Sequence, residues 1–247
     1  MKQTKSIRAR ASGAIKAVNP VSAVAKAYVS LINKREYARP PFNMPNERPV
    51  EYAYVFTQLA RFYPGNVLDV GTGVTALPHL MANCGLKTTA IDNVSDYWGQ
   101  GMWNRHYLVL DDDIRAPRLK QSFDMITCVS TLEHIEECDE AVKSMSKLLN
   151  PGGHIVLTFP YNEKTGVPNV YTLPTSNTRK VPTFKARAYC RLDLDRWCKK
   201  YGLKIVDQEY WRYFTGNYWT EGEQLKIPVK VGQNEAHQIS CVLFEKI

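Results

Sequence analysis

The sequence predicts an α/β fold, a doubly wound and mostly parallel sheet of seven strands whose last strand is antiparallel. Three observations predict it. Short apolar segments alternate with helical patterns along most of the chain. The first of these segments runs into a glycine-containing turn, and acids close the next ones, as is typical where parallel strands end at a ligand-binding edge. A chain of 247 residues with 44% hydrophobic residues is also long enough for one such domain with a substantial core.

The predicted elements follow one another in order. A helix is expected over 20–36, because Asn19 can cap it, Pro20 suits its first turn and apolar residues repeat at helical spacing until two prolines end it. A second helical pattern, 48–62, leads into the first strand, and a later one covers 193–201. Further helices separate the seven strands, which are predicted at 67–71, 87–91, 106–110, 124–129, 154–159, 203–209 and 238–245.

The turn after the first strand is the most informative feature. Residues 67–73 read Val-Leu-Asp-Val-Gly-Thr-Gly. Gly71 and Gly73 have no side chain, so the turn can bend tightly and a ligand can lie against bare backbone. Two glycines alone favour an ordinary tight turn, but Asp92, which ends the next strand, can accept hydrogen bonds from both ribose hydroxyls. With Ala76 the turn also satisfies the dinucleotide fingerprint, so NAD remains an alternative at this point.

Three further segments decide between the cofactors. Residues 108–114 form a strand ending in acids, and segments 122–134 and 148–159 follow in order. Together with the glycine turn they resemble the class I S-adenosylmethionine-dependent methyltransferases from about Val67 to Phe159. The resemblance implies a Rossmann-like methyltransferase fold, S-adenosylmethionine as the cofactor and methyl transfer as the reaction.

The resemblance also implies roles at the ribose and methionine ends of the cofactor. Asp69 would lie near the methionine amino group, Gly71 and Gly73 beneath the cofactor, and Asp92 on the ribose. One departure is Thr75, which stands where the family often has a third glycine. This threonine narrows the loop without filling the cofactor site.

Four more residues receive roles from the same resemblance. Asp113 would accept a hydrogen bond from the exocyclic amine of adenine, while Ile114 would cover the face of the ring. Backbone carbonyls near Ser130 and Thr131, just past the fourth strand, would help to hold the methionine end. These residues complete the predicted cofactor site.

His134 is the predicted catalytic residue. It lies a few residues past the fourth strand, near where the methyl group should project, and its side-chain pKa suits proton removal at neutral pH. The alternative is a structural histidine at a helix start. Glu133 and His134 also resemble half of a metal-binding Glu-x-x-Glu-His pattern of some 2′-hydroxyl and catechol-type methyltransferases, but Ser130 replaces the first glutamate. We therefore predict no metal.

Charge divides the chain into two predicted parts, a basic arm with its helix at 1–40 and the methyltransferase domain at 41–247. The arm holds nine Lys or Arg and one acid, whereas the remainder carries 23 bases and 23 acids. The arm is interpreted as a solvated tail, a contact for nucleic acid or a peripheral contact for an anionic membrane, or an organelle-targeting segment. No apolar run is long enough to span a bilayer, and we expect a cytoplasmic protein, with organelle targeting as the minority alternative.

Two long segments, 160–190 and 210–237, are predicted to bind the acceptor because each follows a strand that ends at the active edge. Residues 164–191 hold six bases and no acid. This charge suits either a segment that binds a phosphate of the acceptor or a loop exposed to solvent. Six aromatic residues between 210 and 219 suit either a substrate wall or a packed hairpin.

The predicted reaction is O-methylation of a small-molecule or glycan-like acceptor. An acceptor that bears a phosphate would suit the basic segment. The alternative is an RNA or protein methyltransferase recruited through the basic arm. A DNA base is disfavoured, because the segment Ser130–Glu133 lacks the Asn-Pro-Pro-type motif of that class.

Overall fold

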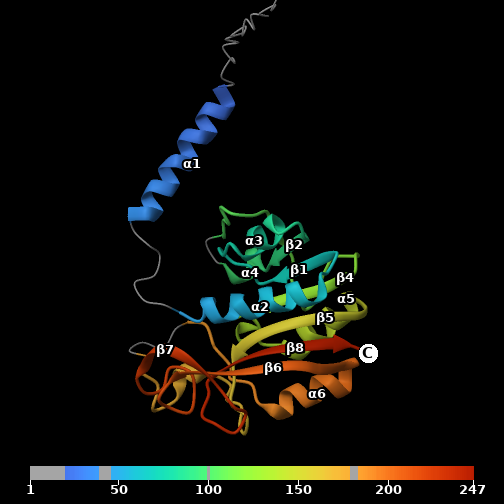
Figure 1. Ribbon diagram of the computed structural model, residues 1–247, viewed down its shortest axis with the longest axis vertical. Helices are drawn as coiled ribbons and strands as arrows, with labels where there is room; N and C mark the ends of the chain where they lie inside the picture. Colours follow the sequence, from blue (N-terminus) through green and yellow to red (C-terminus); the bar gives the residue numbers. More distant parts are fainter. Residues whose placement is uncertain (1–19, 39–45, 99–100, 179–182) are drawn as a thin grey trace, which may run out of the picture. The chain divides into compact units, whose positions relative to one another are not determined.

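The computed structural model describes residues 20–38, 46–98, 101–178 and 183–247 (Figure 1). The chain divides into two compact units, residues 1–46 and Glu47–Ile247. The first unit contains the helix α1 (Pro20–Ala38), which begins at the predicted proline. Its predicted cap, Asn19, and the basic residues before it lie outside the described residues. Among the residues described, no helix is long and apolar enough to cross a membrane.

The second unit is built on one sheet of eight strands in the order β3-β2-β1-β4-β5-β8-β6-β7. β1 pairs in parallel with β2 and β4, β3 pairs in parallel with β2, and β5 pairs in parallel with β4. β8 pairs antiparallel with β5 and β6, and β6 pairs antiparallel with β7. The strands are β1 (Asn66–Val70), β2 (Lys87–Asp92), β3 (Val109–Asp111), β4 (Phe123–Val129), β5 (Leu149–Pro160), β6 (Leu203–Phe214), β7 (Gln224–Val231) and β8 (Ile239–Lys246).

The predicted α/β class and antiparallel ending are confirmed, but the predicted count of seven strands is wrong. The additional strand is β7, which pairs with β6 at the outer edge of the sheet. It falls inside the segment 210–237, for which the sequence predicted acceptor binding and no strand. Apolar and polar residues alternate along most of β7, and Pro228 is tolerated there because an edge strand can lack one hydrogen bond.

Helices cover both faces of the sheet and create two apolar cores. Buried residues of α2 and α3 pack with Val67, Met125 and Val156 on one face. Buried residues of α5 and α6 pack with Ile126 and Ile155 on the other. Neighbouring strand residues therefore point to opposite faces, as expected for a sheet buried on both sides. The helices of this unit are α2 (Arg48–Phe62), α3 (Leu77–Asn83), α4 (Val94–Tyr97), α5 (Cys138–Leu148) and α6 (Arg191–Tyr201), with 3₁₀ turns η1 (Leu132–His134) and η2 (Val170–Thr172).

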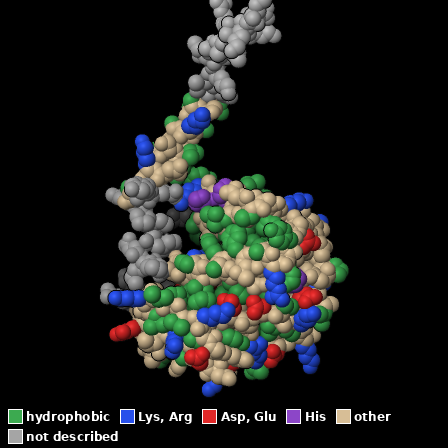
Figure 2. Space-filling model, in the orientation of Figure 1, with side chains coloured by type: hydrophobic (Ala, Val, Ile, Leu, Met, Phe, Trp, Pro, Cys, Tyr) green, Lys and Arg blue, Asp and Glu red, His purple; other side chains and the backbone are tan. Residues whose placement is uncertain are grey.

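The surface of the Glu47–Ile247 unit is electrically mixed. Figure 2 shows Lys and Arg side chains interspersed with Asp and Glu over the visible face of this unit. This agrees with the balance of bases and acids in the sequence after residue 40. A surface of this kind offers no broad basic patch for a nucleic acid on that face.

Candidate active site

The predicted site residues converge at the carboxyl edge of the parallel strands. β1 is paired with both β2 and β4, so the segments that follow these three strands meet at one edge (Figure 1). Asp69 lies near the end of β1, Asp92 ends β2, and Ser130 follows β4 directly. The topology therefore brings together three motifs that are far apart in the sequence.

The two glycines of the turn have different structural roles. Both have positive φ angles, +70° at Gly71 and +53° at Gly73. A Cβ added at Gly71 would lie 2.0 Å from Thr131 Cγ2, and the Thr131 hydroxyl donates to the Gly71 carbonyl at 3.1 Å. Gly71 thus lets the segment after β4 approach the turn. A Cβ at Gly73 would lie 3.4 Å from the Trp98 ring and 4.0 Å from Asp92 Oδ2, so this glycine faces the predicted ribose site.

Asp69 is buried and held by two hydroxyls. Thr72 Oγ1 donates to its Oδ2 and Thr127 Oγ1 donates to its Oδ1, both at 2.7 Å. Burial raises the pKa of Asp69 to about 6, against the lowering effect of these hydrogen bonds. A small cavity of about 10 Å³ adjoins it and is also lined by Arg48, Tyr52 and Gly71. The side chain is therefore fixed where the turn, β4 and α2 meet.

Both carboxylate oxygens of Asp92 accept hydrogen bonds. The backbone amide of Gly73 donates to Oδ2 at 2.7 Å, and the Trp98 indole donates to Oδ1 at 3.0 Å. Burial raises the pKa of Asp92, while the indole and amide donors lower it. Trp98, which sequence reasoning did not single out, thus takes one of the acceptor positions that the ribose hydroxyls would use. Ribose binding at Asp92 therefore requires the indole to move or to share Oδ1.

We expect cofactor binding to change the fluorescence of Trp98. Displacement of an indole from a buried carboxylate alters its polarity and hydrogen bonding, and the signal should saturate with added S-adenosylhomocysteine. A Trp98→Phe variant should lose this signal and bind the same ligand about as tightly or up to about tenfold more tightly, because a competing hydrogen bond has been removed. An identical fluorescence change in the variant would show that another tryptophan gives the signal and that ligand binding leaves the contact between Trp98 and Asp92 unchanged.

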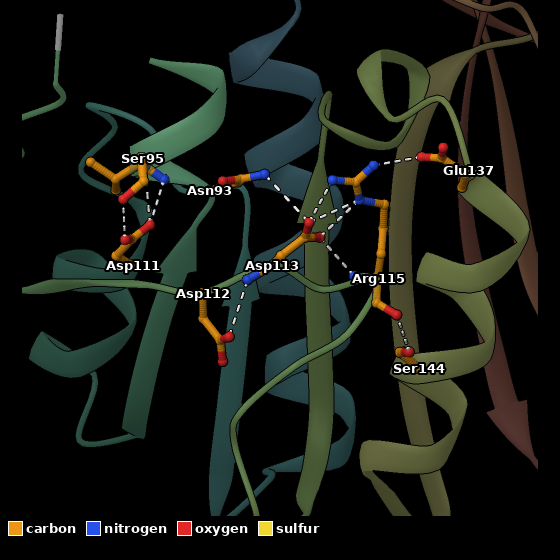
Figure 3. Close-up of polar contacts among 9 residues, drawn as sticks. Asn93, Ser95, Asp111, Asp112, Asp113, Arg115, Glu137 and Ser144 are labelled. Carbon is orange, nitrogen blue, oxygen red and sulfur yellow. Dashed lines mark hydrogen bonds and ion pairs between the residues drawn. The ribbon is translucent and has the colours of Figure 1, made fainter. Parts of the chain in front are cut away.

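The predicted adenine end contains three acids with separate contacts (Figure 3). Asp111 accepts from the backbone amides at the start of α4, and Asp112 is buried beneath the following loop. Asp113 forms an ion pair with Arg115, whose Nη2 lies 2.6 Å from Oδ2, and Asn93 Nδ2 lies 3.4 Å from the same oxygen. Asp113 is therefore next to the segment that follows Asp92, although Arg115 already occupies much of its carboxylate.

Ile114 lies deeper than its predicted role suggests. Its side chain is 4% exposed and belongs to the apolar core packed against α5. The neighbouring Arg115 forms ion pairs with Asp113 and with Glu137 of the loop before α5 (Figure 3). The adenine contacts of Asp113 and Ile114 stay predictions.

The amino-terminal end of α2 brings a charged pair to the site that sequence reasoning missed. Arg48 Nη1 donates to Glu51 Oε2 at 2.7 Å. The Glu51 side chain is fully buried, and its Oε1 accepts from Ser130 Oγ at 2.5 Å and from Thr158 Oγ1 at 2.7 Å. Glu51 therefore fastens α2 to the ends of β4 and β5 and places Arg48 beside the methionine end of the predicted site.

Ser130 combines a special backbone conformation with this contact. Its φ angle is +43°, which non-glycine residues rarely adopt, and its hydroxyl is committed to Glu51. Within the described residues, no group of three or more His, Cys, Asp or Glu side chains is arranged to hold a metal ion. The serine that interrupts the Glu-x-x-Glu-His pattern instead anchors α2.

Glu133 and His134 form the next feature after Ser130 and Thr131. His134 Nδ1 lies 2.6 Å from the Lys185 carbonyl, so this nitrogen carries the proton and donates, leaving Nε2 as an acceptor. Nε2 lies 4.0 Å from Glu133 Oε1. Burial lowers the pKa of His134, whereas burial raises the pKa of Glu133 to about 8. Two proton-binding groups thus lie side by side just past β4.

An aromatic row borders this pair. The His134 ring packs edge-on against Phe184 at 5.2 Å, Phe184 contacts Tyr171 at 5.8 Å, and Tyr171 contacts Trp219 at 5.8 Å. The Trp219 indole donates to Glu47 Oε1 at 2.7 Å, which joins the row to α2. The row therefore draws on both long segments predicted to bind the acceptor.

The predicted aromatic wall is only partly formed as expected. Four of its six residues, Tyr210, Trp211, Tyr213 and Phe214, lie in β6, where Tyr210 and Tyr213 are buried. Their alternation in a strand explains why they pack the sheet rather than line the site. Trp219 does reach the site, where Tyr171 and Phe184 accompany it. These last two residues were not singled out from the sequence.

Two of the six bases in the segment 164–191 form ion pairs with acids from outside it. Lys185 pairs with Glu136 at 2.7 Å, and Arg191 pairs with Glu163 at 3.0 Å. Arg179 and Lys180 lie outside the described residues. These pairs favour the solvated-loop interpretation at two positions, and the phosphate-bearing acceptor stays a prediction.

Comparison with known proteins agrees with this geometry. Residues 46–208, more than half of the chain, match the family profile described as a methyltransferase domain. The chain is 27% identical over 173 residues to the ubiquinone biosynthesis O-methyltransferase of Coxiella burnetii, covering 64% of this chain and 71% of the relative.

Two solved structures share the fold. The N-methyltransferase NodS of Bradyrhizobium japonicum has a TM-score of 0.53 and 20% identity, covering 89% of this chain and 97% of NodS. The 1,6-didemethyltoxoflavin-N1-methyltransferase of Burkholderia thailandensis has a TM-score of 0.53 and 15% identity, covering 92% of this chain and 90% of that enzyme. These structures show the shared fold, and the family match over more than half of the chain shows that this chain belongs to the class I S-adenosylmethionine-dependent methyltransferases.

Proposed function

We propose that this methyltransferase transfers the methyl group to a hydroxyl of a small acceptor that carries a planar ring. The observation that carries the proposal is the proton-binding pair Glu133 and His134 beside the aromatic row at the carboxyl edge of β4. Planar rings pack well against aromatic side chains, and a hydroxyl needs a base. The Coxiella burnetii relative is named as an O-methyltransferase, which supports oxygen as the methylated atom.

The cofactor is proposed to lie along the carboxyl edge from Asp113 to Arg48. Asp92 accepts from the ribose, Gly73 gives the ribose room, and Asp113 with Ile114 serves the adenine. Near the methionine end, Asp69 faces the amino group, Arg48 suits the carboxylate as a fixed cation, and the segment of Ser130 and Thr131 adds backbone acceptors, while Gly71 lets that segment approach. The residues present therefore fit S-adenosylmethionine.

The protein's own contribution to the reaction is alignment and proton removal. When bound, S-adenosylmethionine supplies a methyl group on a positively charged sulfonium, which reacts with an aligned nucleophile. The aromatic row orients the acceptor ring, and the pair of buried Glu133 and half-buried His134 holds the hydroxyl proton. The Glu133 side chain is only 5% exposed, which limits the access of water to its carboxylate.

A screen of acceptors tests the proposal. Purified protein is incubated with S-adenosylmethionine and with matched sets of phenols, arylamines, sugars and sugar phosphates, and released S-adenosylhomocysteine is measured. We expect the phenols to be methylated on oxygen and the sugars, with or without phosphate, to react at least about tenfold more slowly, because stacking on the aromatic row favours a planar ring. Faster turnover of sugars or sugar phosphates would replace the planar acceptor with the glycan-like one.

A further inference from the structure

Glu133 is a buried carboxylate, one oxygen of which has no hydrogen-bond partner among the described residues. Its side chain is 5% exposed, and the unpaired oxygen is Oε2. Buried polar atoms are nearly always paired, so an orphaned carboxylate oxygen needs a reason. Glu133 lies in η1 and interacts electrostatically with Arg48, which lines the cavity beside Asp69. The Glu133 side chain is therefore near the predicted methionine end of the cofactor.

The surroundings of Glu133 favour its protonated form. Three carboxylates, including its own, face a single guanidinium at the start of α2, because Arg48 lies near both Glu47 and Glu51. Like charges in a buried site raise the affinity of a carboxylate for a proton. The titratable or charged groups that face Glu133 are Glu47 just before α2, Arg48 and Glu51 of α2, Tyr97 of α4, Cys128 of β4, His134 of η1, Tyr171 of η2 and Tyr189.

His134 is the weaker base of the neighbouring pair. Its Nδ1 is committed to the Lys185 carbonyl, and burial lowers its pKa below the ordinary value. Burial raises the pKa of Glu133 to about 8. A general base works best when its pKa lies near the working pH and when it is strong enough to compete for the proton. On both grounds Glu133 suits the task better than the histidine predicted from the sequence.

We propose that Glu133 is the catalytic residue that takes the proton from the acceptor hydroxyl, and that His134 is a positioning residue. The inference rests on the proposed O-methylation and names the group that the reaction uses. As the acceptor oxygen bonds to the methyl carbon, the electrons of the carbon–sulfur bond remain on sulfur. The hydroxyl proton moves to Glu133 Oε2. It leaves afterwards past His134, whose side chain is 23% exposed.

The first test needs neither cofactor nor acceptor. The pKa of Glu133 is raised by folding from its ordinary 4.5 to about 8, so the protonated carboxyl stabilises the fold below about pH 4.5, and this contribution is lost as the pH rises through about 8. Glutamine has no such proton to lose. The melting temperature of Glu133→Gln relative to the parent should therefore increase by at least about 5 °C between about pH 5 and pH 9.

Glu140→Gln is the matched control for the melting experiment. Glu140 is an exposed acid of α5 paired with Lys143, so the melting difference between this variant and the parent should not change with pH. A melting difference for Glu133→Gln that is equally constant from about pH 5 to pH 9 overturns the inference, because Glu133 would then be ionised throughout in the folded protein.

The second test separates proton removal from alignment by using two phenols at about pH 8. Phenol is protonated at this pH and needs a base, whereas 4-nitrophenol is already ionised. Glu133→Gln should lower the turnover of phenol by about 10² to 10⁴ and that of 4-nitrophenol by less than about tenfold. His134→Ala should lower both by a similar factor, as expected of a positioning residue, and the affinity for S-adenosylhomocysteine should stay unchanged in both variants.

The outcomes distinguish a failure of the inference about Glu133 from a failure of the proposed function. Equal losses for the two phenols in Glu133→Gln overturn the inference, and a loss confined to phenol in His134→Ala assigns the proton to the histidine instead. If the parent methylates neither phenol, the proposed planar hydroxyl acceptor fails. The melting experiment then still decides whether Glu133 holds a proton in the folded protein.

Discussion

Replacing Glu51 with leucine is expected to destabilise the Glu47–Ile247 unit by about 3 to 5 kcal/mol. The carboxylate is fully buried, and its loss leaves the hydroxyls of Ser130 and Thr158 without their acceptor and Arg48 without this ion pair. Chemical denaturation of the variant and the parent measures the difference. The same substitution should also weaken S-adenosylhomocysteine binding, because α2 would no longer hold Arg48 beside Asp69.

Glu51→Gln is the matched control, since glutamine keeps one oxygen for the two hydroxyls and loses the charge and the acceptor for Arg48. Its destabilisation should be smaller, about 1 kcal/mol. A Glu51→Leu variant that unfolds within about 1 kcal/mol of the parent would show that other contacts fasten α2 to the sheet.

Replacing Asp92 with alanine is expected to weaken S-adenosylmethionine binding by tenfold to a hundredfold while the fold survives. The change removes a charge-assisted acceptor worth about 1.5 to 3 kcal/mol. It also releases the Gly73 amide and the Trp98 indole, which now donate to this carboxylate. Calorimetry gives the affinity, and circular dichroism checks that the variant is folded. Unchanged affinity in a folded Asp92→Ala protein would remove Asp92 from the ribose site.

The parallel half of the sheet was predictable because its strands are apolar runs, and the first three of them end in acids or run into a glycine. The pattern failed where local polar contacts or an edge position decided the outcome. The strand predicted at 106–110 begins only at Val109, because the Asn104 side chain accepts from the amides of His106 and Tyr107 and holds them in a turn. β7 was missed although apolar and polar residues alternate along most of it, because Pro228 interrupts the pattern and is tolerated only at an edge.

The cofactor side of the site was predictable for a related reason. The glycines and Asp92 follow strands, and parallel strands bring their carboxyl ends to one edge. Arg48 and Glu51 belong to no motif. Their only signal is position, since a helix joined to β1 by a short turn packs antiparallel to it and brings its amino-terminal end to the carboxyl edge. Trp98 and Phe184 reach the site through loops, whose paths depend on tertiary contacts that periodicity does not encode.

Calorimetric titration of the parent protein with S-adenosylhomocysteine and, separately, with NAD tests the central claim most directly. The two ligands share an adenosine, so the comparison isolates the methionine end, where Asp69 and Arg48 meet near the cavity beside the turn. We predict that S-adenosylhomocysteine binds once per chain and more tightly than NAD. Tighter binding of NAD would contradict the assignment of this site to S-adenosylmethionine.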